Sequence, residues 1–190
     1  MITLIHGFNV KDPMSSVGKL KYYFHNHTQI FDYGWRFFSV LWHNKKDAER
    51  LVKEIKPNRW NILFGHSNGC AIAVEAARQG AKIDTLVCIN PALKVDTKFP
   101  ESIKRILVIH TKNDKPTQAA RFFDKVPFIQ IVIPNAWGAM GAKGYTGKDY
   151  RVTNWDLSNY LEGHSDFFRQ HNLEQLMPEI KDFLSERWLN

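Results

Sequence analysis

Six short and almost uninterrupted apolar runs constrain the fold of this 190-residue chain more than any other feature. They alternate with segments whose apolar residues recur at helical spacing, as at 45–55 and 68–79. Short, nearly continuous apolar runs are typical of strands that are buried on both faces, as in a parallel sheet. The six candidate strands are residues 2–6, 36–41, 60–64, 85–89, 105–110 and 128–133.

The alternation predicts a three-layer α/β/α sandwich with a mainly parallel six-stranded sheet, because right-handed crossovers place helices on both faces. Numbered along the chain, the strands are expected in the order 2-1-3-4-5-6. Ligands of such sheets bind beyond the carboxyl ends of the strands, where the strand order reverses. We therefore expect the functional site between the first and third strands. Further helices are predicted at 15–26, 117–124 and 166–189, with a break at Pro178.

The length suits a single domain over residues 1–190. One segment, 135–163, departs from the alternation and is rich in glycine and aromatic residues. Unstructured loops of that length are unusual in compact domains. We expect a long loop or hairpin insertion near the functional site.

Composition and charge exclude some classes of protein and leave others open. The net charge of +7 favours anionic substrates, acidic surfaces or loose nucleic-acid contact, although a solvated basic surface also explains it. The two cysteines, Cys70 and Cys88, have the surroundings of small buried residues, so a reducing compartment is expected rather than a disulfide framework. The opening MITLIHGF resembles neither a signal peptide nor a membrane span, and this predicts a cytoplasmic protein.

The third run leads into Gly65-His66-Ser67-Asn68-Gly69, which opens a helical segment. A sharp strand-to-helix turn exposes the serine hydroxyl, and the two glycines remove side chains that would collide with strand and helix. The N-terminus of the helix favours negative charge beside the serine. This pattern predicts a nucleophile, while a glycine-rich turn without chemistry is the alternative.

The first run ends in His6-Gly7-Phe8. An oxyanion hole needs one N–H group from this loop and a second from the residue that follows the nucleophile. Phe8 and Asn68 occupy those positions. His6 fits a structural role better than the role of a base.

Four motifs together resemble those of the α/β-hydrolase superfamily: HGF at 6–8, GHSNG at 65–69, KND at 112–114 and GH at 163–164. The resemblance implies Ser67 as nucleophile, Asp114 as triad acid and His164 as general base, in the family's usual order. It also implies Phe8 and Asn68 as donors to the oxyanion. The first two strands of the usual sheet and a helical cap are not recognisable, which implies a reduced, lidless member similar to small esterases or lipases.

The residues themselves leave alternatives for two members of this triad. Asp114 follows an apolar run, where a carboxylate can meet a histidine from the next connection, but it also suits an ordinary Lys-Asn-Asp turn. Asp96 competes with it for the role of the acid. His164 precedes a helical segment and could equally be a surface-loop histidine.

The expected function is hydrolysis of a carboxyl ester or thioester through an acyl-enzyme on Ser67. The expected partner is a small-molecule acyl substrate, with no cofactor, no metal and no specific nucleic acid, and the oligomeric state stays open. Trp137, Met140, Tyr145 and Trp155 either form one wall of the acyl pocket or pack their segment onto the domain. The alternatives are a non-catalytic binding protein on an α/β-hydrolase scaffold and, with less support, a nucleic-acid-binding protein.

Overall fold

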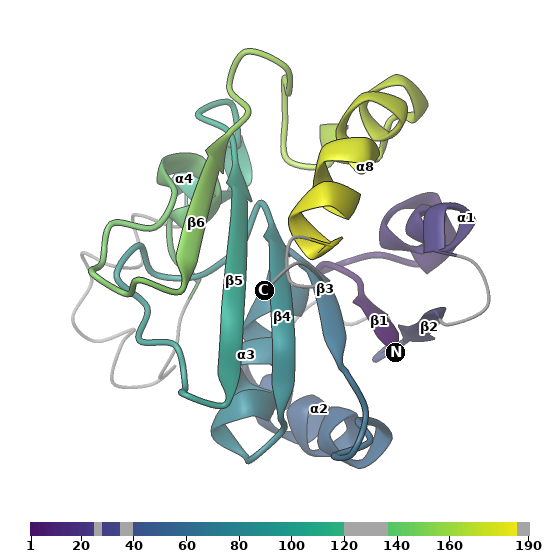
Figure 1. Ribbon diagram of the computed structural model, residues 1–190. Coiled ribbons are helices and arrows are strands. Elements are labelled where there is room, and N and C mark those ends of the chain that lie inside the picture. The colour runs from purple at the N-terminus through teal and green to yellow at the C-terminus, as the bar shows by residue number, and fades with distance from the viewer. Residues whose placement is uncertain (25–27, 35–39, 120–136, 186–190) are drawn as a thin grey trace.

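The computed structural model describes residues 1–24, 28–34, 40–119 and 137–185. Its sheet has six strands in the order β2-β1-β3-β4-β5-β6, and every neighbouring pair is parallel (Figure 1). This confirms the predicted fold class and strand order. The strands are β1 (Ile2–Ile5), β2 (Thr28–Phe31), β3 (Ile62–His66), β4 (Ile83–Ile89), β5 (Ile103–His110) and β6 (Val152–Asp156).

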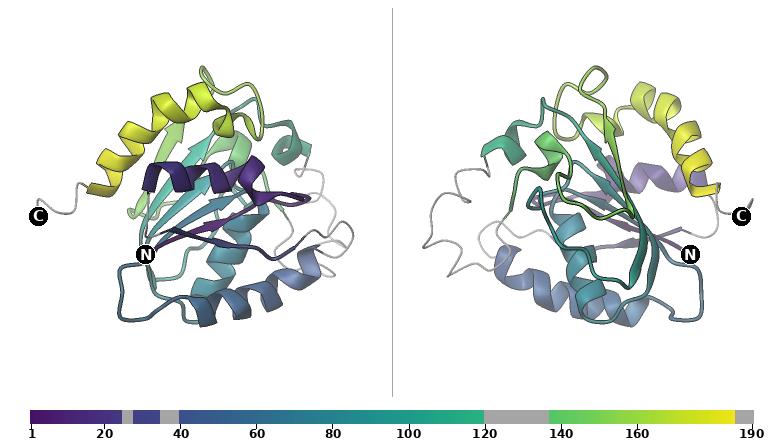
Figure 2. Two further views of the ribbon diagram at one scale, coloured as in Figure 1. Left: turned by 90° about the vertical axis from the view of Figure 1, so that its right-hand side faces the viewer. Right: turned by 60° about the vertical axis from the view of Figure 1, so that its left-hand side comes forward.

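Helices cover both faces of the sheet (Figure 2). On one face α2 (Val40–Glu54) and α3 (Asn68–Arg78) enclose a hydrophobic cluster with the sheet. On the other face α1 (Lys21–Phe24) and α8 (Gln170–Ser185) enclose a second cluster. Shorter helices are η1 (Pro13–Ser15), η2 (Val17–Leu20), α4 (Lys115–Ala119), α7 (Met140–Lys143) and η4 (Asp166–Phe168).

The central strands form as expected because their side chains are buried on both faces. Every residue of β4 is buried. In β5, Ile106 and Val108 belong to the cluster under α3, whereas Leu107 and Ile109 belong to the cluster under α8. Alternate side chains of one strand thus fill both cores, as the nearly continuous apolar runs require.

The two edge strands differ from the prediction. The second strand is β2, Thr28–Phe31, and not 36–41, of which 36–39 lie outside the described residues and the last two residues begin α2. The sixth strand is β6, Val152–Asp156, while the predicted run 128–133 lies outside the described residues. Edge strands carry more exposed polar positions than central ones, so a search for apolar runs passes over them.

The sequence predicted a long loop or hairpin over residues 135–163, but the described part of this segment, 137–163, is neither. It contains α7 and then β6, which pairs with β5 in parallel. Pro178 lies within α8 and not at a break between helices, and the expected helix at 15–26 is divided into η2 and α1. None of the helices in the described ranges is long and apolar enough to cross a lipid bilayer.

Candidate active site

Ser67 lies at the sharp turn between β3 and α3. Its φ of 52° and ψ of −118° place a non-glycine residue in a sparsely populated backbone region, a strain that persists only where the surroundings impose it. They do so here: Ser67 N–H donates to the carbonyl oxygen of Ile89 at 3.0 Å, and Ala92 N–H donates to the carbonyl oxygen of Ser67 at 3.2 Å. The end of β4 therefore holds the turn in place.

The two glycines of the motif are required by close backbone contacts. A Cβ on Gly65 would lie 2.8 Å from the backbone nitrogen of Cys70, and one on Gly69 would lie 2.4 Å from the carbonyl oxygen of Ile5. Real Cβ atoms essentially never approach backbone atoms so closely. A side chain at either position would displace the turn that carries Ser67.

His164 and Asp114 meet although 50 residues separate them in the sequence. His164 Nδ1 lies 2.8 Å from Asp114 Oδ2, and Asp114 Oδ1 accepts a hydrogen bond from the N–H of Thr117 at 3.0 Å. Asp114 is fully buried, whereas the His164 side chain is 17% exposed. The competing carboxylate, Asp96, lies on the exposed surface. The structure therefore pairs the histidine with Asp114.

The loops that carry these two residues are tied together by hydrogen bonds. Asn113 Nδ2 donates to the carbonyl oxygens of Leu161 and Ser158, at 2.8 Å and 3.1 Å. Thr111 Oγ1 also donates to the Leu161 carbonyl, at 3.0 Å. These contacts bring the turn after β5 against the loop that leads to His164.

Three residues that the sequence did not indicate also shape this region. His66 Nε2 and Asn90 Nδ2 both contact the carbonyl oxygen of His164, at 3.1 Å and 2.6 Å. Gly141 lies against the acid, since a Cβ there would be 2.6 Å from Asp114 Oδ2. These contacts join segments far apart in the chain, and no local pattern predicts them.

The loop of His164 lies beside the turn of Ser67. The ring centroids of His66 and His164 are 4.8 Å apart. No hydrogen bond joins Ser67 to His164 within the part of the chain that the structure describes. Catalytic hydrogen bonds are often long in ligand-free sites and shorten when substrate binds.

The predicted oxyanion donors lie on two segments that meet at the same turn. A Cβ on Gly7 would be 3.2 Å from Ser67 Cβ, so the loop after β1 touches the turn directly. The Asn68 side chain is buried, and its Oδ1 accepts a hydrogen bond from Trp137 Nε1 at 2.8 Å. The rings of Phe8 and Trp137 pack with centroids 5.0 Å apart. Phe8, Asn68 and Trp137 thus lie together.

The other three residues of the expected acyl-pocket wall, Met140, Tyr145 and Trp155, do not form one surface. Met140 is fully buried, and it belongs with Tyr145 to the core cluster under α3. Trp155 lies on the opposite face of the sheet, where its ring packs against Phe183 with centroids 6.0 Å apart. A wall shared by all four residues is therefore wrong, because β6 points Trp155 into the other core.

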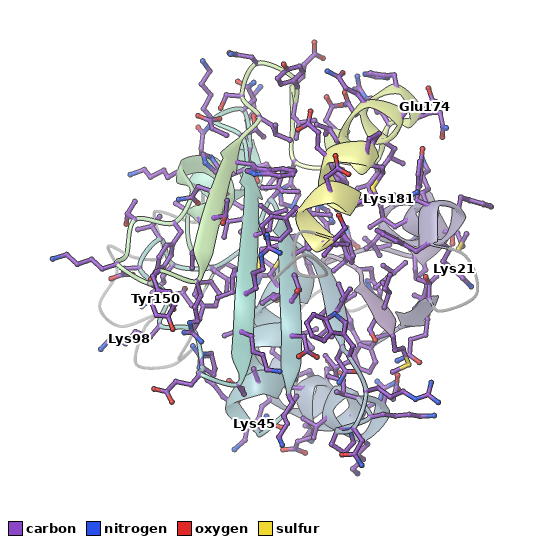
Figure 3. All side chains as sticks on the ribbon, in the orientation of Figure 1. Lys21, Lys45, Lys98, Tyr150, Glu174 and Lys181 are labelled. Carbon is purple, nitrogen blue, oxygen red and sulfur yellow. The ribbon has the colours of Figure 1, made fainter. Side chains whose placement is uncertain are left out.

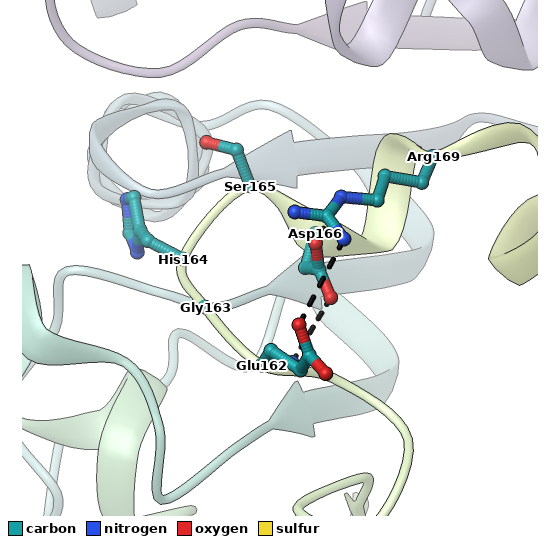
Figure 4. A pocket seen from close by; sticks show the side chains of 6 residues that line it. All are labelled: Glu162, Gly163, His164, Ser165, Asp166 and Arg169. Carbon is teal, nitrogen blue, oxygen red and sulfur yellow. Dashed lines mark hydrogen bonds and ion pairs between the residues drawn. The ribbon is translucent and has the colours of Figure 1, made fainter.

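A pocket of about 370 Å³ is lined by the loop residues 162–166, which include His164, and by Arg169 (Figure 4). Arg169 is paired there with Asp166 at 2.5 Å and with Glu162 at 3.8 Å. Figure 4 shows the His164 side chain pointing away from this charged group. Within the described ranges, no three histidine, cysteine or acidic side chains gather as metal ligands would.

Burial determines the ionisation of two groups next to the serine. Burial, together with the nearby charge of His164, lowers the pKa of His66 to about 3, so its ring is neutral near pH 7. Burial raises the pKa of the Cys70 thiol. A buried thiol of raised pKa is a poor nucleophile, which leaves Ser67 as the nucleophilic candidate at this turn.

Comparison with known proteins identifies the fold. Neither a protein-family model nor a curated protein matches the chain. Solved structures do match over most of its length. A hydrolase from Xanthomonas campestris assigned to the α/β superfamily has a TM-score of 0.56 and 14% identity, covering 95% of this chain and 98% of its own.

Two esterases give similar values. The esterase domain of a Rhodothermus marinus protein has a TM-score of 0.56 at 11% identity, covering 98% of this chain and 85% of its own. An esterase from Pyrococcus furiosus has a TM-score of 0.55 at 16% identity, and the match covers 97% of this chain and 79% of the esterase. Together with the parallel sheet and its strand order, these likenesses show that the chain has the α/β-hydrolase fold.

Proposed function

We propose that this protein is a serine hydrolase that cleaves a carboxyl ester or thioester through an acyl-enzyme on Ser67. The observation that carries the proposal is the 2.8 Å contact between His164 Nδ1 and the buried carboxylate of Asp114. It lies beside a serine that its neighbours hold at a φ of 52°. Backbone strain and a buried carboxylate–histidine pair are both costly, and both are common at catalytic sites.

In the proposed reaction, His164 Nε2 takes the proton of the Ser67 hydroxyl as its oxygen attacks the substrate carbonyl. Asp114 holds the imidazole through Nδ1–H and stabilises the imidazolium that forms. The N–H groups of Phe8 and Asn68 donate to the tetrahedral oxyanion. His164 then protonates the leaving alcohol or thiol. The same base activates a water molecule that releases the acid and restores Ser67.

We take residues 1–190 as one catalytic domain acting on a small-molecule acyl substrate. The two cysteines are free and buried in the structure, which supports a reducing compartment such as the cytoplasm. The names of the similar solved structures, two of them esterases, support the choice of reaction class.

A chain-length series of p-nitrophenyl esters and matching thioesters tests the proposal. The wild-type protein should hydrolyse at least the short members, and Ser67→Ala should lose this activity while its Tm stays unchanged. Asp96→Asn serves as the control, because Asp96 is exposed and should not contribute. Activity that survives in Ser67→Ala would contradict the assignment of the nucleophile.

A non-catalytic binding protein on the same scaffold remains the second candidate. The observation that favours it is the missing hydrogen bond between the described residues Ser67 and His164. A fluorophosphonate probe separates the two candidates, because it reacts only with an activated serine. Absence of labelling in folded protein would favour the binding protein.

The surface offers little support for a nucleic-acid-binding function. In Figure 3, Lys21 on α1 and Lys181 on α8 lie near each other, whereas Lys45 on α2 and Lys98 in the loop between β4 and β5 lie on other parts of the surface. Nucleic-acid-binding domains instead gather their cations on one face or along one helix. Salt-sensitive binding to oligonucleotides in a protein without esterase activity would reverse this judgement.

A further inference from the structure

The backbone carbonyl of His164 is held by two buried side chains. Asn90 Nδ2 donates to this oxygen at 2.6 Å, and His66 Nε2 donates to it at 3.1 Å. Asn90 is fully buried and His66 is 3% exposed. The proton transfers proposed above do not use this carbonyl, so the chemistry itself does not explain why two buried polar groups converge on it.

The two donors come from neighbouring strands of the sheet. His66 ends β3 and pairs with Ile89 of β4, so Asn90 follows at the same edge. Asn90 has a φ of +44°, a left-handed conformation that asparagine tolerates better than most residues. Its N–H donates to the carbonyl oxygen of Ile109 at 2.8 Å, which fixes this unusual backbone from β5. Both donors are thus set on rigid strand ends.

The contacts give His164 two separate anchors. Asp114 holds the ring through Nδ1, and the two donors hold the backbone through the carbonyl oxygen. A histidine on a loop could keep its bond to Asp114 while the loop swings its Nε2 away from the serine. With the backbone also held, the direction of Nε2 is determined.

We propose that His66 and Asn90 are positioning residues that aim His164 at Ser67 by holding its backbone carbonyl. The inference rests on the proposed function and deepens it, because it assigns roles to two residues outside the triad. Misplacement of a catalytic group by about 1 Å can cost on the order of 10² in rate. The effect on reaction rate should therefore be large even though both side chains are buried.

The protonation state of His66 suits this role. The carbonyl oxygen of His164 can only accept, so Nε2 of His66 carries the proton and Nδ1 is bare. Nδ1 has no hydrogen-bond partner among the described residues. Because burial lowers the pKa of His66 to about 3, the ring stays neutral and does not oppose the positive charge that His164 acquires during the reaction.

Two substitutions of His66 provide a matched test. The amide nitrogen of glutamine lies near the position of Nε2, whereas that of asparagine lies near the position of Nδ1. His66→Gln should keep the hydrogen bond to the carbonyl, and His66→Asn should lose it. We expect the second-order rate of fluorophosphonate labelling at Ser67 to fall on the order of 10² in His66→Asn. In His66→Gln it should stay within a few-fold of the wild-type rate.

A second variant and a control cover the case in which His66→Asn does not fold. Asn90→Gly removes the other donor at a positive φ that glycine adopts without strain, and it should also slow labelling. His110→Asn removes another buried imidazole at a strand end, one whose Nδ1 is likewise unpartnered. It should lower Tm without slowing labelling.

The outcomes separate this inference from the proposed function. Wild-type protein without Ser67-dependent labelling refutes the proposed function. The positioning role is then decided by the ¹⁵N relaxation of the His164 ring, which should show a rigid ring in the wild type and a mobile ring in His66→Asn and Asn90→Gly. The positioning role is overturned if folded His66→Asn is labelled at the same rate as His66→Gln, or if Asn90→Gly is labelled at the same rate as His110→Asn. A His164 ring that is equally rigid in the wild type and in all variants overturns it as well.

Discussion

Two carboxylate–histidine pairs lie near the carboxyl ends of the strands, and they are built in opposite ways. In the pair of Asp114 and His164 the carboxylate is fully buried and the imidazole is 17% exposed. In the pair of Asp32 and His6, 3.1 Å apart, the imidazole is fully buried and the carboxylate side chain is 59% exposed. Both pairs consist of a carboxylate and an imidazole, but the imidazole is the more exposed group in the first pair and the carboxylate is the more exposed group in the second.

The difference separates the proposed general base, His164, from a histidine with a structural role, His6. His6 Nδ1 lies 2.9 Å from the carbonyl oxygen of Gly7, Nε2 faces Asp32, and the ring stacks on Tyr33 with centroids 4.0 Å apart. Both ring nitrogens are engaged, so His6 has none left for proton transfer. His164 contacts Asp114 through Nδ1, and in the proposed reaction its Nε2 takes the proton of Ser67. A buried acid and a partly exposed imidazole are the arrangement that the proposed catalytic role of His164 requires.

Substitution of the two histidines, one at a time, should give the largest difference in kcat and stability. His164→Ala should lower kcat for p-nitrophenyl acetate on the order of 10⁴, because the proposed general base is lost, and its Tm should change little. His6→Gln should instead lower stability, by about 1–3 kcal/mol, because a buried carbonyl loses its partner. Its kcat should fall less than tenfold. Steady-state kinetics and thermal unfolding of both variants check this, and equal losses of kcat would abolish the distinction.

The close contact at the buried acid should give the next largest effect. A Cβ on Gly141 would lie 2.6 Å from Asp114 Oδ2, so Gly141→Ala should shift the carboxylate. We expect kcat to fall on the order of 10² with little change in KM. Gly163→Ala is the matched control, since its Cβ would meet nothing within 4 Å. Unchanged kinetics in Gly141→Ala would show that the position of Asp114 is not critical.

A third histidine sharpens the comparison, because the partner of His66 is a carbonyl and not a carboxylate. The pKa of His66 is about 3 in the folded protein against an ordinary 6.5. Between these values the unfolded chain binds a proton that the folded chain does not, so the free energy of unfolding decreases as pH falls. The slope should reach about 1.4 kcal/mol per pH unit below pH 6. His66→Gln should lose this part of the acid sensitivity in denaturant titrations, and an unchanged slope would contradict it.

Substitution of the exposed carboxylate, Asp32, should have the smallest effect on stability and kcat. Asp32→Asn removes a charge whose side chain is largely in solvent, where ion pairs are worth about 0–1 kcal/mol. We expect a loss of stability within that range and kcat close to the wild-type value, as measured by urea unfolding and ester hydrolysis. A loss of kcat as large as that in Gly141→Ala would mean that the second pair also contributes to catalysis.

The central part of the fold could be predicted from the sequence, and the edges could not. The strands β3, β4 and β5 are apolar because they are buried on both faces, so their composition identifies them. The edge strand β2 has only one fully buried residue, Phe31, and β6 has exposed positions at Thr153 and Asn154. The run 36–41 is more apolar than either, and its last residues belong to a helix.

Some residues of the candidate site could likewise be predicted from the sequence, and others could not. Ser67 and His6-Gly7-Phe8 stand in motifs whose local geometry is encoded by neighbouring residues. Asn90, His66 and Gly141 act through contacts with segments far away in the chain, for which spacing in the sequence carries no signal. The position of Asp114 after an apolar run allowed its pairing with His164, and the family resemblance implied it, but the residues alone left Asp96 as a competitor; the structure gives the pairing a geometry.

The most direct measurement is to trap the acyl-enzyme. Wild-type protein is mixed with p-nitrophenyl acetate, quenched in acid during turnover, digested and mapped by peptide mass spectrometry, with Ser67→Ala and His164→Ala treated in parallel. We predict an acetyl group on Ser67 in the wild type, strongly reduced in His164→Ala and missing in Ser67→Ala. Turnover with an acetyl group on another residue, or with Ser67 acetylated equally in His164→Ala, would contradict the triad.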